Sequence, residues 1–200
     1  MKILIITTVI LLVLLVVLQI YTTMATSKIE TQEYKVIRVE KLFEIRYYPA
    51  AVLAKISSTS TSYRDLGYSG FGKLAKYIFG GNSEHKQIAM TSPVHMDIGD
   101  STSTMAFVMP SNLKMDDLPK PDNADIIIQP SAPEYVAVIT FGGFANAAKI
   151  AKHKTILENI LKKKGVTHYG HFRYLGYNPP FQLFGRKNEV IVALYPDNFN

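Results

Sequence analysis

A repeated order of strands and helices constrains the fold of this sequence more than any other feature. Two helices are expected, at residues 62–79 and 145–164, and they end at Gly80 and Gly165. Each helix lies between one preceding strand and two following strands. A proline lies 13 residues after the first glycine (Pro93) and 14 residues after the second (Pro179). We therefore predict two half-domains, each with the order strand, helix, strand, strand.

The expected strands are short segments rich in β-branched and aromatic residues. They cover residues 34–39, 43–48, 51–57, 86–91, 104–109, 125–129, 135–141, 172–177 and 189–195. Proline cannot donate a ladder hydrogen bond, so Pro93 and Pro179 are expected at an edge, a bulge or a rim. We predict an α+β fold in which the duplicated unit forms a distorted β-barrel with two outer helices, preceded by an N-terminal hydrophobic helix.

Residues 1–27 form a separate apolar segment. Residues 3–18 carry no charge, and Lys2 is the only charged side chain before Lys28. As a helix, residues 3–18 span about 24 Å, or about 30 Å if residues 19–23 continue them, close to the thickness of a bilayer core. Apolar regions of signal peptides are usually shorter, although residues 23–25 offer a small-residue cleavage site. We expect residues 1–27 to be a signal anchor or a cleaved signal peptide.

The remaining residues, 28–200, have the length of one domain. Lys2 and the terminal amine favour an N-terminus in the cytoplasm. A single span would then hold the domain on the outer, periplasmic or lumenal side of the membrane, and cleavage of the segment would export it.

Charge and cysteine content exclude several classes of site. The sequence has no cysteine, which excludes disulfides, cysteine zinc sites, iron–sulfur clusters and covalent c-type haem. Residues 28–200 carry 21 basic and 16 acidic side chains, a net charge of +5. Many of the lysines fall in residues 149–164, where they fit the solvated face of one helix. The basic charge also suits an anionic small ligand or membrane surface, and nothing indicates a nucleic-acid partner.

The sequence offers no clear catalytic or metal-binding motif. His168 and His171 are the closest histidine pair, and no third ligand follows nearby. The methionines Met90, Met105 and Met109 fall in apolar strands, where they are expected to fill the core rather than bind copper. Nucleophile elbows, paired carboxylates and phosphate-binding loops are absent from the sequence. We expect a binding protein rather than an enzyme.

Three glycines in the first expected helix are unusual. Gly67, Gly70 and Gly72 each cost helix stability relative to alanine, by about 1 kcal/mol. They permit either close packing of the helix on a sheet or room for a flat ligand beside the backbone. In the second case Tyr68 and Phe71 would supply apolar faces, with Lys73 or Lys76 as a cation at the edge.

Several segments, taken in order, resemble the SOUL haem-binding family. They are FEIRYY, FGKLAKYIFGGN, IAMTSPV, FGGFA and GYNPPFQLFGRKNEV, and the resemblance covers residues 33–195. It implies a distorted β-barrel with two outer helices and internal pseudo-symmetry. It also implies non-covalent binding of haem or other tetrapyrroles, without established catalysis.

The resemblance implies a binding groove between the first helix of the domain and a loop before the last strand. On this sequence the groove falls on the residues Tyr68, Phe71, Ala75, Lys76, Phe181 and Gln182.

The sequence departs from the family pattern at two of its positions. Tyr47 stands where one branch has a histidine proposed as an iron ligand, and tyrosine can also bind ferric haem. Gln182 stands where another branch has a lysine suited to a haem propionate, and Lys76 or Arg186 could replace that cation.

The predicted function is therefore binding, buffering or transport of haem or another tetrapyrrole by a membrane-tethered or exported domain. The alternative is a binder of other hydrophobic small molecules on the same duplicated fold, or an enzyme that acts on them.

Overall fold

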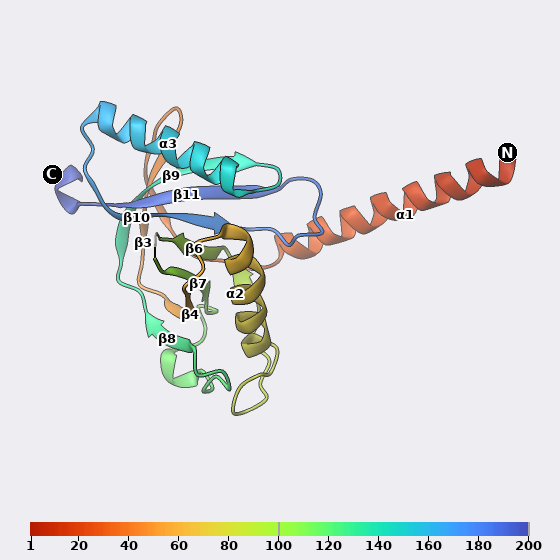
Figure 1. The fold of residues 1–200 in the computed structure, drawn as a ribbon, viewed down its shortest axis with the longest axis horizontal. Helices are drawn as coiled ribbons and strands as arrows, with labels where there is room; N and C mark the ends of the chain where they lie inside the picture. Colours follow the sequence, from red (N-terminus) through yellow and green to blue (C-terminus); the bar gives the residue numbers. More distant parts are fainter. Residues whose placement is uncertain (100, 200) are drawn as a thin grey trace.

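The computed structural model describes residues 1–99 and 101–199. A long helix, α1 (Lys2–Ser27), projects from a body built on one large antiparallel sheet (Figure 1). Two further helices, α2 (Tyr63–Ile78) and α3 (Ala147–Lys164), cover one face of the sheet. Leu66 and Leu74 of α2 share a single core with Leu157 and Leu161 of α3 and with the strands beneath them. The predicted α+β class and N-terminal apolar helix are confirmed.

The sheet has nine strands in the order β2-β3-β9-β11-β10-β6-β7-β4-β8. Their bounds are β2 (Lys35–Val39), β3 (Glu44–Tyr48), β4 (Val52–Ser58), β6 (Val94–Ile98), β7 (Ser103–Val108), β8 (Ile126–Pro130), β9 (Glu134–Gly142), β10 (His168–Gly176) and β11 (Lys187–Leu194). Two short strands, β1 (Glu30–Thr31) and β5 (Thr91–Ser92), pair in parallel as a separate sheet. Two 3₁₀ turns are η1 (Met115–Asp117) and η2 (Pro196–Phe199).

The predicted barrel is wrong, because the sheet stays open between β2 and β8. All five residues of β2 are exposed, and they include Lys35 and Arg38. Strand β8 ends at Pro130, which has no amide hydrogen to donate. Exposed charges and proline are common on edge strands, where they discourage further pairing.

The same pairing scheme occurs twice in this sheet. In β4-α2-β6-β7 and in β9-α3-β10-β11 the first strand pairs with the last, and the last pairs with the middle strand. The two middle strands, β6 and β10, pair with each other and join the units. An origin of the two units by duplication stays a prediction.

The predicted equivalence of Pro93 and Pro179 is wrong. Residues 86–90 form no strand, and Pro93 lies directly before β6, whereas Pro179 lies after β10. Hydrogen bonds from the Asn82 side chain hold residues 82–86 where a strand was expected to begin. Asn82 donates to the carbonyls of Tyr77 and Lys86, which holds the loop after α2 against the helix end.

The two helices of the body begin and end at residues suited to those places. Ser62 caps α2 by accepting from the Asp65 amide, and Asn146 caps α3 by accepting from the Lys149 amide. Gly165 ends α3 in the left-handed conformation, with φ 68°, which glycine adopts without strain.

A buried ionic cluster lies on the sheet face opposite the helices. The Glu189 carboxylate is fully buried and accepts from Arg46, Tyr177, Thr140 and Lys187. The Arg46 guanidinium is 3% exposed and lies 3.0 Å from Glu189. Burial and the nearby Glu189 charge raise the pKa of Tyr48 to about 12.

The chain that follows α1 is fixed to the body. The Gln32 amide donates to the Ser92 carbonyl at 2.7 Å, and the Gln32 side chain pairs with His95 Nε2 at 2.8 Å. The Glu30 carboxylate accepts from the Ser111 amide. These contacts begin three residues after α1 ends, so the helix is joined to the body through ordered chain.

We expect Arg46→Met to lower the free energy of unfolding by about 3–5 kcal/mol, because it leaves the Glu189 carboxylate buried with less compensation. The matched control is Arg38→Met. Its ion pair with Glu40 is exposed, and exposed pairs contribute about 0–1 kcal/mol. Urea unfolding followed by circular dichroism would measure both, and equal losses in the two variants would contradict the expectation.

His95 should make the protein less stable in acid. Burial, with the nearby Arg173 charge, lowers the pKa of His95 to about 3. The unfolded chain has the ordinary value of about 6.5, so between these values it binds a proton that the folded chain does not. The free energy of unfolding therefore falls as the pH falls through this window. Urea midpoints measured at neutral and acidic pH should decline less in His95→Gln than in the parent, and an identical decline would contradict this role.

Candidate functional site

One flank of α2 carries an exposed, mostly apolar stripe. Arg64, Tyr68, Phe71 and Ala75 follow one another at intervals of four, three and four residues, which places them on the same side of a helix. Tyr68 is 76% exposed and Phe71 40% exposed. We call these four residues the α2 flank. The structure thus brings together three of the predicted site residues.

The paired residues of β7, β6 and β10 relate the position of this flank to that of the loop between β10 and β11. The Phe71 ring meets the Phe107 ring edge-on at 5.3 Å between centroids. Phe107 on β7 pairs with Val94 on β6, and Val94 pairs with Gly176 at the end of β10. Two strand spacings are about 10 Å, so Phe107, which the Phe71 ring contacts, lies about that far across the sheet from Gly176, the residue before the loop.

The glycines of α2 have different surroundings. A Cβ atom on Gly70 would come within 3.3 Å of the Met105 sulfur, so Gly70 permits close packing of the helix on β7. A Cβ atom on Gly67 or Gly72 would meet nothing within 4 Å. Gly67 therefore leaves open space beside the α2 flank, whereas Gly70 serves the core.

The cations expected near the site lie elsewhere on α2. Lys76 is five residues from Phe71, which turns it about 140° away around the helix. Lys73 faces the other edge of the helix, where its ammonium lies 2.9 Å from the Asp125 carboxylate. Arg64 is instead the exposed cation on the α2 flank. The sequence analysis missed it, although its helical spacing to Tyr68 and Phe71 was the available signal.

Hydrogen bonds from the side chains of Gln182 and Arg186 stabilise the loop of residues 177–186. Gln182 is 2% exposed, donates to the Phe184 carbonyl and accepts from the Asn178 amide group. Arg186 donates to the carbonyls of Pro179 and Gln182 at 2.6 and 2.7 Å. Gln182 and Arg186 are thus engaged within the loop, and Phe181 is exposed.

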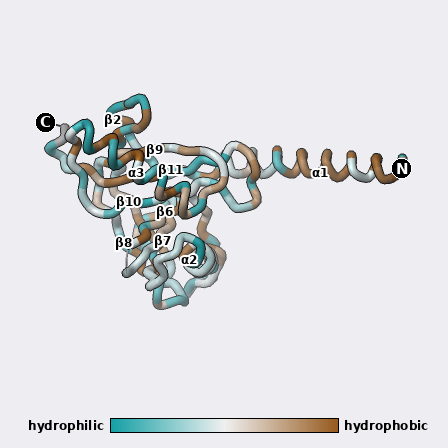
Figure 2. The backbone as a smooth tube through the Cα atoms, turned by 45° about the horizontal axis from the view of Figure 1, so that its top comes forward, coloured by the Kyte–Doolittle hydropathy of each residue, from teal (hydrophilic) through white to brown (hydrophobic). Residues whose placement is uncertain are grey.

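The same loop forms hydrogen bonds with the C-terminal part of α1, a contact that was not predicted from the sequence. The Gln19 amide group donates to the Phe181 carbonyl, and its oxygen accepts from the Leu183 amide at 2.9 Å. Thr26 donates to the Gln182 side-chain oxygen. Figures 1 and 2 show α1 leaving the body beside this loop. The available signal was the polar series Gln19, Thr22 and Thr26 along one side of an apolar helix.

Tyr47 lies far from these residues. Its ring packs against Tyr135 at 5.0 Å, and Tyr135 pairs with Leu194 on β11. The loop of residues 177–186 ends at Lys187, at the other end of β11. Seven residues of strand separate the two places by about 23 Å. The structure therefore does not bring Tyr47 near the α2 flank or the loop.

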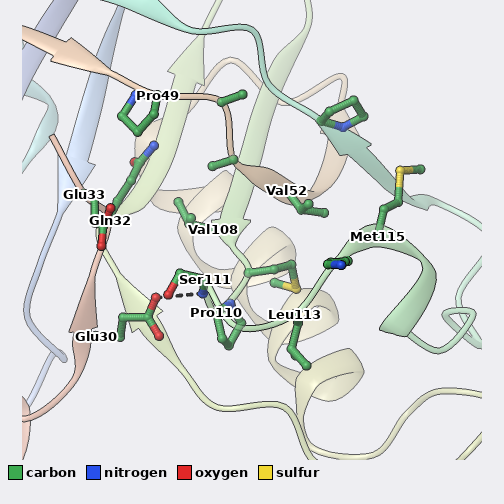
Figure 3. Close-up of a pocket in the computed structure, with 15 residues that line it drawn as sticks. Glu30, Gln32, Glu33, Pro49, Val52, Val108, Pro110, Ser111, Leu113 and Met115 are labelled. Carbon is green, nitrogen blue, oxygen red and sulfur yellow. Dashed lines mark hydrogen bonds between the residues drawn. The ribbon is translucent and has the colours of Figure 1, made fainter.

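Two pockets are described in the structure, and neither is lined by a predicted site residue. The first, of about 370 Å³, lies beside β1 between Val52, Val108 and Met115 (Figure 3). Its walls include Glu30 and Glu33, whose negative charge does not suit an anionic ligand.

The second pocket, of about 200 Å³, lies between the two helices of the body over the sheet. Tyr63 of α2, Ile150 and Lys154 of α3, and Arg173 and Tyr174 of β10 are among its lining residues. Its volume is below the range of about 300–1,000 Å³ typical of drug-sized ligands. Within residues 1–99 and 101–199, no cluster of three histidine, aspartate or glutamate side chains could hold a metal ion.

Solved structures with this fold have low sequence identity to the chain. The C-terminal domain of EcmrR superposes with a TM-score of 0.56 and 10% identity, covering 81% of this chain and 98% of that domain. A hydrolase from Listeria innocua superposes with a TM-score of 0.53 and 6% identity, covering 80% and 94%. At these identities the likeness extends to the fold alone.

Sequence relatives are more informative. Heme-binding protein 2 of Mus musculus and of Homo sapiens are each 34% identical over 156 residues, 74% of this chain and 76% of each relative. Heme-binding protein 1 of Xenopus laevis is 27% identical over 155 residues, 74% of this chain and 81% of the relative.

A family model described as SOUL heme-binding protein matches residues 29–193, which include all of the sheet except Leu194, the α2 flank and the loop of residues 177–186. The chain belongs to the SOUL heme-binding protein family.

Proposed function

We propose that this protein binds haem or a related tetrapyrrole non-covalently, and that it buffers or transports this ligand. The ligand lies on the surface between the α2 flank and the exposed Phe181 of the loop of residues 177–186. Family membership supports the ligand class.

The observation that carries the site is the register line from Phe71 through Phe107 and Val94 to Gly176. It sets Phe107, the strand residue that Phe71 contacts, about 10 Å across the sheet from the residue before the loop. A porphyrin is flat and apolar on both faces, so burial of those faces supplies most of the binding free energy. Open space beside Gly67 lets the macrocycle approach the helix backbone.

Arg64 is the cation that we propose for a haem propionate. It lies on the same flank as Tyr68 and Phe71, and its guanidinium can bind a carboxylate through two hydrogen bonds. Lys76 faces another side of α2, and Arg186 already donates to carbonyls of the loop. Gln182 then positions the loop, with no direct part in holding the ligand, and Tyr47 has no part as an axial ligand.

Helix α1 is proposed as a membrane anchor. It has 26 residues and is long and apolar enough to cross a bilayer. Its large hydrophobic side chains are exposed along its whole length, and Gln19 and Thr22 are its only buried residues. Exposed apolar side chains in such number are stable in lipid rather than in water. The domain on the outer, periplasmic or lumenal side remains our expected orientation.

A second candidate ligand is a smaller hydrophobic molecule. The pocket of about 200 Å³ between α2 and α3 supports it, because Lys154 beside apolar walls suits a small ligand with an acidic group, whereas Arg173 is already paired with Glu134. Hemin titration separates the two candidates: a saturable shift of the Soret band near one equivalent supports a tetrapyrrole ligand, and a linear response without saturation excludes it.

Phe71→Asp should raise the Kd for hemin roughly 10- to 100-fold, because loss of an aromatic contact costs about 1.5–3 kcal/mol. The control is Phe79→Asp, since Phe79 is also exposed but caps the end of α2, about 12 Å along the helix axis from Phe71. Titration of the full chain in detergent, followed at the Soret band, would measure both Kd values. Unchanged affinity in Phe71→Asp would move the ligand away from α2.

Arg64→Glu should weaken hemin binding more than Lys76→Glu, because only Arg64 lies on the α2 flank. A single charge-assisted hydrogen bond contributes about 1.5–3 kcal/mol, so we expect roughly a tenfold or larger effect at low salt that shrinks as salt is added. Both positions are exposed on α2, which makes the variants a matched pair. A larger effect at Lys76 would mean that the propionates lie on the other side of the helix.

A further inference from the structure

Several backbone polar atoms of the loop of residues 177–186 are paired within the protein. The carbonyls of Asn178, Pro179, Phe181, Gln182 and Phe184 all accept hydrogen bonds from side chains of the loop or of α1. The amide of Gln182 donates within the loop, and the amide of Leu183 donates to Gln19. Pro179 and Pro180 have no amide hydrogen. Five of the ten carbonyls and two of the eight amides of this loop are thus paired within the protein.

The apolar side chains of the same loop are turned outward. Phe181 is 60% exposed, Leu183 40% and Phe184 69%. An adjacent loop, residues 142–146, adds Phe144, which is half exposed and lies under the Arg186 guanidinium at 4.4 Å. A loop in water usually exposes polar groups and buries large apolar side chains. This loop instead exposes its apolar side chains while several of its carbonyls are paired inside the protein.

The depth of the loop along α1 follows from its hydrogen bonds. A bilayer core of about 30 Å needs about 20 helical residues, so a span that starts at Ile3 ends near Thr22. Gln19 lies within the last turn of that span and holds Phe181 and Leu183 at its own level. The loop therefore lies at the boundary between acyl chains and headgroups.

The hydrogen bonds between Gln19 and the loop make this depth favourable for α1 and for the loop. An unpaired glutamine amide in lipid would cost several kcal/mol, and irregular backbone is tolerated there only when its polar groups are paired. Gln19 is paired by the loop, and Gln19, Gln182 and Arg186 pair five carbonyls and one amide of the loop. Gln19 and the loop therefore lower the free-energy cost of placing each other's polar groups in an apolar surrounding.

The charges at this end of the body also suit a lipid surface. Residues 141–144 contact Arg186 and Asn188, and neither they, the loop of residues 177–186 nor α1 contains an aspartate or glutamate. Lys28, one residue after α1, and Lys149, in the first turn of α3, are exposed basic residues, whereas Arg186 and Lys187 are engaged with loop carbonyls and with Glu189. Basic side chains close to a membrane are attracted to anionic headgroups, by about 1 kcal/mol each.

We propose that the loop of residues 177–186 is embedded in the interface of the bilayer that α1 crosses, with Phe181, Leu183 and Phe184 among the lipids. This inference rests on the proposed membrane attachment of α1. It also places the ligand surface beside the lipid, so that a hydrophobic ligand dissolved in the membrane reaches Phe71 without crossing bulk water.

The sequence contains no tryptophan, so single replacements give clean fluorescent reporters. The full chain is reconstituted into vesicles of phosphatidylcholine and phosphatidylglycerol that carry brominated acyl chains. Phe184→Trp and Phe181→Trp report on the loop, and two independent positions guard against a variant that fails to fold. Leu15→Trp reports on α1, and Phe79→Trp reports on an equally exposed phenylalanine at the far end of α2.

We expect the loop reporters to shift to the blue and to be quenched several-fold more strongly than Phe79→Trp. Quenching of Leu15→Trp with both loop reporters unquenched would overturn the inference and leave the anchor intact. Absence of quenching in Leu15→Trp would overturn the anchor and the inference together. Equal quenching at all four positions would mean general adsorption of the body, which also overturns a contact specific to the loop.

Discussion

The antiparallel ladder between β6 and β10 is the interaction on which the arrangement of the site depends. It is the one place in the described sheet where the two strand-helix-strand-strand units pair, and its register sets Val94 opposite Gly176. A slip by one residue would turn Val94 away from the helices and shift the loop of residues 177–186 relative to α2. The distance between β7, which α2 covers, and the start of the loop is thus fixed by backbone pairing, and with it the spacing of the two halves of the proposed ligand surface.

The loop of residues 177–186 combines two roles that are usually separate. Arg186 and Gln182 are polar side chains that serve as an internal scaffold, which leaves the apolar side chains free to face outward. A lysine in place of Gln182 could not both accept from Thr26 and donate to the Phe184 carbonyl, because an ammonium has no acceptor. The glutamine at this position suits a loop that contacts both α1 and its own backbone.

Local signals in the sequence predicted the helices well, and the sheet closure poorly. Ser62 and Gly165 marked helix ends through backbone chemistry that acts over a few residues, and both are found as caps. Closure of the sheet depends on whether β2 and β8 meet, which is a property of strand twist and edge composition across the whole chain. Proline spacing misled the comparison of the two halves, because Pro93 and Pro179 mark opposite ends of their strands.

The candidate site was predictable only where it lies on one helix. Tyr68, Phe71 and Ala75 share a flank by helical geometry alone, and Arg64 could have been added by the same rule. The burial of Gln182 and the isolation of Tyr47 depend on contacts between residues far apart in sequence, 156 positions in the case of Thr26 and Gln182. No local pattern carries such information.

Because Gln19 forms hydrogen bonds with the loop of residues 177–186, removal of α1 would change the surroundings of that loop. Proteolysis after Ala25 would remove Gln19 and leave the Phe181 carbonyl and the Leu183 amide without their partners. Water would replace those contacts, and the loop would loosen while the sheet and α2 kept their packing. Signal processing would then release the protein from the membrane and at the same time alter one wall of its ligand surface, so that location and ligand retention change in a single step.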